Sequence, residues 1–212
     1  MSSCRNADAR RLTVTLLLVS SAVFLSGCAH SNLPPSPVPA QEAAAMTAPV
    51  APSDNPTLTA EEVGKRFLKL IEGLESRSDL TPDRIHQVVG ISLEARPDTL
   101  GTVFWSEDLG EGWRYAFDYI PASPSLLQGV GLSFEHEEDG YSDMTVICGL
   151  GFDDYHSALK AMGFRDMPIH GEIGQLQSWR YYKNDITLSI IPQNVIAGES
   201  GRLCVKSIGT LN

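Results

Sequence analysis

The spacing of apolar residues changes at Pro97 in this chain of 212 residues. Before Pro97, apolar side chains recur every three or four positions, as on one face of a helix. After it, apolar and polar residues alternate, most clearly over 113–119, and this alternation is typical of a half-buried strand. Helices followed by alternating strands predict an α+β fold with an antiparallel sheet. The first helical face consists of Val63, Phe67, Leu70, Ile71 and Leu74.

Start and stop residues set the limits of two helices in the first part of the chain. Thr59 and Glu62 have the spacing of a capping box, in which each residue caps the backbone of the other. Thr81 followed by Pro82 predicts a second helix start, and Gly90 predicts its end. Both segments are expected to be packing helices.

The second half of the chain repeats the order of helix and then strands. A helix is predicted from Asp153 or Asp154 to Gly163. We therefore expect helices on one face of an antiparallel sheet, in an acidic lobe over 57–150 and a second lobe over 151–212. The predicted strands are 102–105, 113–119, 130–134 and 144–148 in the first lobe, and 169–173, 177–182, 186–191 and 202–208 in the second.

The first 28 residues have the pattern of a secretory signal. Three arginines within 5–11 precede an apolar run over 12–24, and small residues follow. The run is shorter than the roughly 20 residues that a membrane-spanning helix needs. We predict a signal peptide over 1–27 that is removed from the mature protein.

Leu25-Ser26-Gly27-Cys28 resembles the cleavage box of bacterial lipoproteins, in which the cysteine becomes the lipid-carrying N-terminus. The resemblance implies acyl chains such as palmitate on Cys28, and anchoring to a membrane of the cell envelope on the periplasmic side. Ala29 stands where many inner-membrane lipoproteins have Asp, so the resemblance implies the outer membrane. The Pro- and Ala-rich residues 28–56 predict a disordered tether.

Cys148 and Cys204 are the two cysteines that remain in the folded part of the chain. In an oxidising envelope they can form a disulfide. Two buried thiols that pack as small apolar residues are the alternative. The sequence leaves both readings open.

Acidic residues are concentrated in the first half of the folded part. Residues 57–150 contain 17 acidic and 7 basic side chains, whereas residues 151–212 contain six of each. This charge disfavours nucleic acid and anionic lipid as partners and favours a protein with a basic surface; a solubilising face is the alternative. The candidate partner-binding residues are two acidic clusters and two tryptophans: Trp105, Glu107, Asp108, Glu111, Trp113, Glu135, Glu137, Glu138 and Asp139.

Motifs that would indicate catalysis are weak. Gly149-Leu150-Gly151 precedes a helix, as in a dinucleotide fingerprint, but Asp153 and Asp154 would repel a phosphate, which favours a plain turn. His136 lies among acidic residues that could hold a cation or could form a solvated hairpin. We expect no catalytic residues, no metal and no cofactor, and therefore not an enzyme.

Two further resemblances concern the folded part. Leu80-Thr81-Pro82-Asp83-Arg84-Ile85 with Val88-Val89-Gly90, followed by strands, resembles small domains of the BamE and β-lactamase-inhibitor-protein type. These have a helix pair before a curved antiparallel sheet.

The whole chain is also similar to envelope immunity lipoproteins, through Leu58-Thr59-x-Glu61-Glu62-Val63 and the aromatic strand from Trp113. That resemblance implies tight inhibition of a secreted antibacterial effector, namely a hydrolase that attacks peptidoglycan or lipid. A structural or assembly lipoprotein of the outer membrane is the alternative.

Overall fold

The computed structural model describes residues 55–95, 101–138, 143–193 and 202–212. All described residues belong to one compact unit, Val50–Asn212. The predicted signal peptide, Cys28 and nearly all of the predicted tether therefore lie outside the described residues. Within the described part, none of the helices is both long and apolar enough to cross a bilayer.

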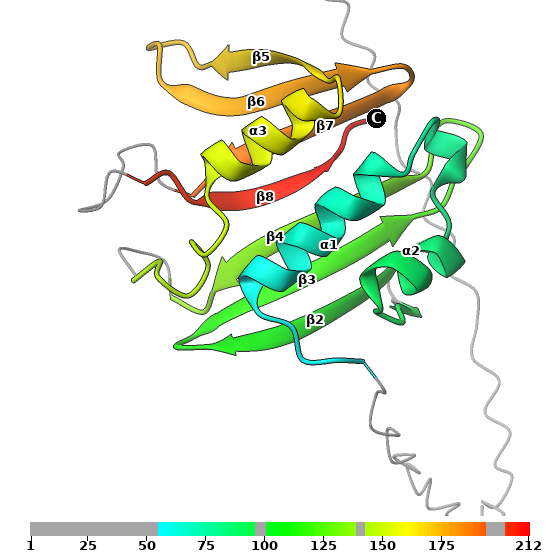
Figure 1. Cartoon of the computed structure of the whole chain (residues 1–212), viewed down its shortest axis with the longest axis horizontal. Helices are drawn as coiled ribbons and strands as arrows, with labels where there is room; N and C mark the ends of the chain where they lie inside the picture. The colour runs from blue at the N-terminus through cyan, green and yellow to red at the C-terminus, as the bar shows by residue number, and fades with distance from the viewer. Residues whose placement is uncertain (1–54, 96–100, 139–142, 194–201) are drawn as a thin grey trace, which may run out of the picture. The chain divides into compact units, whose positions relative to one another are not determined.

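The described residues form an α+β fold with one antiparallel sheet of eight strands (Figure 1). The order of strands in the sheet is β1-β2-β3-β4-β8-β7-β6-β5. The helices are α1 (Ala60–Glu72), the 3-10 helix η1 (Arg77–Asp79), α2 (Pro82–Val89) and α3 (Phe152–Ala161). The strands are β1 (Glu94–Ala95), β2 (Val103–Gly110), β3 (Trp113–Ile120), β4 (Gly129–His136), β5 (Arg165–His170), β6 (Leu176–Lys183), β7 (Ile186–Pro192) and β8 (Val205–Thr210).

The predicted helix ends are confirmed for α1 and α2. The backbone N–H of Glu62 donates to Thr59 Oγ1 at 3.2 Å, and the Thr59 N–H donates to the Glu62 carboxylate at 3.0 Å. Thr81 accepts from the Arg84 N–H at 3.1 Å, and Gly90 ends α2 with φ +81°. A left-handed residue at this position suits glycine, which has no Cβ to clash with the backbone.

The strand predicted over 144–148 is wrong. The backbone N–H groups of Ile147 and Cys148 both donate to the Met144 carbonyl, at 3.1 and 2.9 Å, so this segment is a turn. Ile147 is buried there without any strand pairing, and short apolar runs do not distinguish a strand from a buried turn by their periodicity. The strand predicted over 169–173 is shifted, because β5 ends at His170.

Both halves of the folded part contribute to the same sheet. Residues 57–150 provide β1 to β4 and residues 151–212 provide β5 to β8. They meet where β4 pairs with β8 over three register pairs: Gly131↔Gly209, Leu132↔Ile208 and Ser133↔Ser207. We call this pairing the seam.

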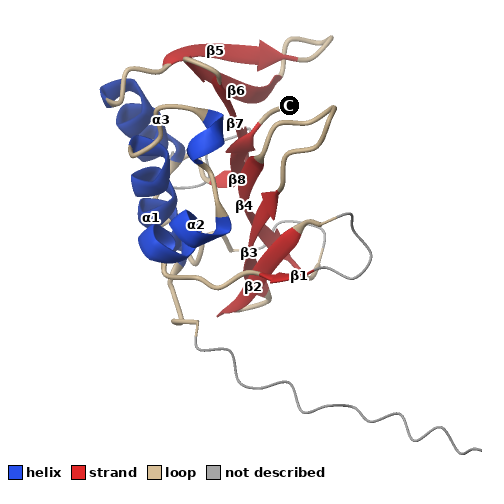
Figure 2. Cartoon of the chain, turned by 90° about the vertical axis from the view of Figure 1, so that its right-hand side faces the viewer, coloured by secondary structure: helices blue, strands red, loops and turns tan. Residues whose placement is uncertain are grey.

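Helices α1, α2 and α3 lie to one side of the sheet (Figure 2). Trp113, Tyr115, Phe117 and Tyr119 of β3 are buried at alternate positions, and the Phe67 ring of α1 meets the Phe117 ring at a centroid distance of 5.9 Å. The hydrophobic core therefore lies between the helices and this face of the sheet. We call the opposite face, formed by the other alternate residues, the open face.

Arg77 is a charged residue inside the folded unit, with 1% of its surface exposed. Its Nε donates to the Gln128 carbonyl at 2.6 Å, beside the start of β4. One terminal nitrogen donates to the Leu211 carbonyl at 2.7 Å, just after β8, and the other donates to Asn212 Oδ1 at 3.1 Å. Arg77 therefore holds one end of the seam against η1.

Replacing Arg77 with Met should lower the free energy of unfolding by about 2–4 kcal/mol, because two backbone carbonyls lose a charged donor in a buried position. Urea denaturation followed by circular dichroism measures the change. Arg165→Met, at an exposed position, is the control and should change stability by less than about 0.5 kcal/mol. Equal, small effects of both substitutions would contradict this role for Arg77.

Candidate functional site

The two acidic clusters of the sequence come together at one end of the sheet. The turn between β2 and β3 lies beside the end of β4, since Arg114 is in register with Glu135 and the Glu137 N–H donates to the Gly112 carbonyl at 3.1 Å. We call this region the acidic corner. Its carboxylates are Glu107, Asp108, Glu111, Glu135, Glu137 and Glu138. Asp139, the remaining predicted acid, lies outside the described residues.

The turn at the acidic corner has an unusual backbone. Gly110, Glu111 and Gly112 all have positive φ, at +86°, +54° and +78°. Asp108 Oδ1 accepts the Gly110 N–H at 2.6 Å, where the register between β2 and β3 shifts. Two glycines make this tight reversal accessible, and its hydrogen bonds fix the direction in which the Glu111 side chain leaves the backbone.

His136 supports the corner rather than a metal ion. Its Nδ1 accepts the Glu138 N–H at 3.0 Å, and its Nε2 lies 3.0 Å from the Glu111 carbonyl, to which it donates. The ring also meets the Trp113 ring at 4.9 Å. The Nε2 bond connects β4 with the β2–β3 turn, and the Nδ1 bond orders the residues that follow β4. Among the described residues, no group of three or more His, Cys, Asp or Glu could hold a metal ion.

Trp113 is not the exposed anchor that the sequence suggested. It is 2% exposed, and its Nε1 donates to the Asp143 carbonyl at 2.8 Å. The reason is that Trp113 occupies one of the inward-facing positions of β3. Trp105 is half-buried and also packs against the core. The two tryptophans therefore form the base of the corner.

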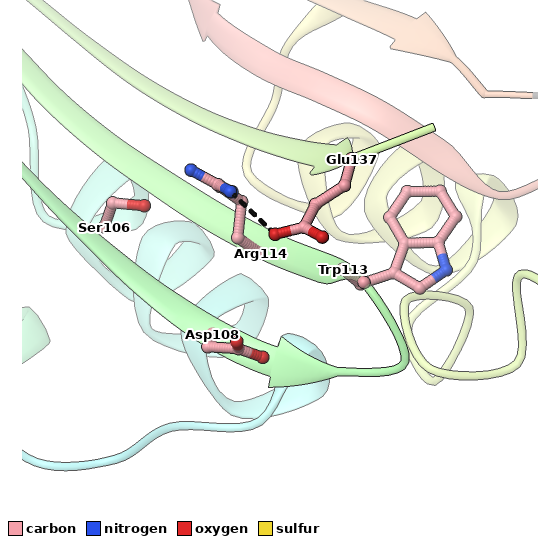
Figure 3. Close-up of a pocket in the computed structure, with 6 residues that line it drawn as sticks. Ser106, Asp108, Trp113, Arg114 and Glu137 are labelled. Carbon is pink, nitrogen blue, oxygen red and sulfur yellow. Dashed lines mark hydrogen bonds and ion pairs between the residues drawn. The ribbon is translucent and has the colours of Figure 1, made fainter. Parts of the chain in front are cut away.

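A shallow hollow of about 270 Å³ opens at the corner, at the edge of the open face (Figure 3). Arg114 lies across it and contacts a Glu137 carboxylate oxygen at 3.3 Å. Asp108, by contrast, forms no ion pair within the described part of the chain. The hollow is lined by Ser106, Asp108, Gly112, Trp113, Arg114 and Glu137.

Arg114 and Ser106 were not identified from the sequence. Each of them lies between two inward-facing residues of its strand. This alternation is the sequence signal that could have placed both side chains on the open face. Arg114 forms an ion pair with Glu137, and the other five carboxylates of the corner form no ion pair with a cation of the described residues. The corner therefore keeps a strong negative potential.

Glu107 differs from the other acids because it is half-buried and in register with Tyr115. Burial raises the pKa of Tyr115 to about 12, and the Glu107 carboxylate adds to this effect. The Tyr115 hydroxyl therefore stays protonated at neutral pH. The other five carboxylates of the corner are exposed, so a partner can reach them: Asp108, Glu111, Glu135, Glu137 and Glu138.

A disulfide attaches the turn at 145–149, which lies between β4 and α3, to the sheet. Cys148 and Cys204 are joined, with their Cα atoms 5.1 Å apart. Cys204 immediately precedes β8, so the bridge lies at the end of the seam opposite to Arg77. Asp143, just before this turn, accepts from the Thr145 hydroxyl and N–H, which lowers the pKa of Asp143.

Aromatic residues of the second half form a separate cluster. His156 Nδ1 lies 2.9 Å from the Tyr181 hydroxyl, and the His156 ring packs against Phe152 and Trp179. Tyr181 is fully buried, and burial raises the pKa of its hydroxyl. We interpret this cluster as the packing of α3 on β6.

The chain matches no protein-family model, no curated protein and no solved structure.

Reducing the disulfide should lower the free energy of unfolding by about 2–4 kcal/mol, because a bridge across 56 residues restricts the unfolded chain. Thermal unfolding with and without dithiothreitol measures this loss. The double variant Cys148→Ser with Cys204→Ser is the control: it should have the lower stability under both conditions. A wild type that is insensitive to the reductant, although its thiols are shown to be free, would contradict the prediction.

Proposed function

We propose that the protein is a lipid-anchored envelope lipoprotein that binds and inhibits a secreted antibacterial effector. The observation that carries this proposal is the convergence of two acidic segments, distant in sequence, at the acidic corner. The cleavage box ending in Cys28 supports an envelope location, where such effectors act. By resemblance, the target is a hydrolase of peptidoglycan or lipid.

The acidic corner suits a basic partner. One of its six carboxylates, Glu137, forms an ion pair with Arg114. The other five form no ion pair with a cation of the described residues. Charges of one sign on a fixed surface increase the association rate with an oppositely charged surface. A partner with a basic cleft is therefore favoured over a neutral one.

The backbone of the corner is already ordered for binding. The three left-handed residues fix the turn, and the β2–β3 hairpin is held against β4 by the His136 Nε2 bond to the Glu111 carbonyl and the Glu137 N–H bond to the Gly112 carbonyl. A loop that is ordered before binding loses less conformational entropy on association. We propose that this hairpin enters the effector's cleft and blocks access of the substrate.

The partner can be recovered with the unit Val50–Asn212, which contains every buried apolar residue that the structure describes. This unit is used as bait for the secreted proteins of the producing cell, and bound proteins are identified by mass spectrometry. We expect to recover one hydrolase, and we expect its activity to be lost when it binds the bait. Recovery of outer-membrane assembly components instead would support the assembly alternative and contradict inhibition.

Charge reversal at the corner should slow binding to the recovered effector. For Glu111→Lys combined with Glu138→Lys, we expect an association rate about 10- to 100-fold lower at low salt, with a smaller difference at high salt. Stopped-flow mixing measures this rate. Glu172→Lys, at the exposed β5–β6 turn, is the matched control and should have little effect. An unchanged rate for the double variant would exclude the corner as the binding surface.

A further inference from the structure

The open face carries a row of eight residues, one from each strand, that crosses the sheet at one level. Strand register places them side by side, and paired residues of neighbouring antiparallel strands point to the same face. From β5 to β1, the row consists of Met167, Arg180, Ser189, Gly209, Gly131, Asp118, Phe104 and Glu94.

This row has opposite charges at equal distances from β8. Arg180 lies on β6, two strands to one side of β8, and Asp118 lies on β3, two strands to the other side. Met167 and Phe104 lie three strands away, again on opposite sides. With a strand spacing of about 4.8 Å, Arg180 and Asp118 are each about 10 Å from Gly209 at the centre.

We propose that two copies of the protein pack open face to open face, about a twofold axis that runs along β8. Such a rotation exchanges the two sides of the row, so Arg180 of each copy faces Asp118 of the other. The interface is isologous, with the same pair of opposite charges formed twice.

The two side chains are arranged to meet. A Cβ added at Gly131 would lie 2.6 Å from Asp118 Oδ1, so the Asp118 carboxylate extends over β4 towards β8. Arg180 is exposed and has no ion pair with any residue that the structure describes. The residues between them are Ser189, Gly209 and Gly131, which are too small to hold the two faces apart.

The two neighbouring rows of the open face, two residues further along each strand in either direction, add apolar contacts. Tyr182 and Ile120 are each two strands from β8, on opposite sides, and therefore face each other in the dimer. Ile191, which is 42% exposed, is one strand from β8 and faces Ser133 of the other copy. Tyr182 and Ile120 thus make an apolar contact, and the large Ile191 of one copy lies over the small Ser133 of the other.

The central strands offer a small interface, at the low end of specific contacts, so we expect a dissociation constant on the order of micromolar. The second copy, rather than an unrelated protein, is favoured because Arg180 and Asp118 lie at equal distances on opposite sides of β8 and therefore pair with each other across the axis. The inference does not depend on the proposed inhibitory function.

Charge swapping tests the arrangement. Sedimentation equilibrium of the unit Val50–Asn212 should show a concentration-dependent dimer. Arg180→Glu alone and Asp118→Arg alone should each weaken it more than about tenfold, because like charges then face each other. An equimolar mixture of the two variants should associate again, since both contacts are then restored. A monomer at all concentrations, or variants that dimerise as the wild type does, would overturn the proposal.

A cysteine on the axis gives a second test that does not require changed charges. Ser207 lies on β8, so the two copies of this residue face each other in the dimer. Ser207→Cys should form an intermolecular disulfide under mild oxidation. Ser178→Cys, on β6, is the control and should not, because its two copies would be about 19 Å apart. Equal cross-linking of the two variants would contradict the axis.

Discussion

The fold depends on the short pairing of β4 with β8, because this seam unites the two halves of the sheet over only three register pairs. It is secured at both ends by different interactions. At one end, the buried Arg77 guanidinium donates to the Gln128 and Leu211 carbonyls, beside β4 and β8. At the other, the Cys148–Cys204 disulfide joins the turn after β4 to the residue before β8. The guanidinium suits this role because its five N–H donors are spread over three nitrogens and point in different directions.

Local features of the fold were predictable because their causes are local. The Thr59–Glu62 capping box and the left-handed Gly90 depend on neighbouring residues only, and both are confirmed. The aromatic alternation of β3 likewise predicted a strand correctly. The seam was not predicted, since β4 and β8 are about 70 residues apart in the chain. No pattern within either strand indicates which strand lies next to it in the sheet.

The candidate site was predictable in composition but not in geometry. The acidic residues were identified, yet their convergence depends on the register of β3 with β4. The exposure of Trp113 was predicted wrongly, because alternation along a strand separates its residues into two faces but does not show which face is buried. Arg77 was missed because a buried arginine looks like any surface cation until its acceptors are known.

The two proposed surfaces have a joint consequence. A twofold axis along β8 keeps the strand direction, so the acidic corners of the two copies lie at the same end of the dimer. Such a dimer would then present two corners to one partner or to two.

Carboxyl footprinting of the protein with its captured effector tests the central claim most directly. We expect Glu111, Glu137 and Glu138 to become protected from modification in the complex, while Glu172 at the β5–β6 turn stays reactive. Protection of Glu172 with unchanged reactivity of the three corner residues would contradict the account.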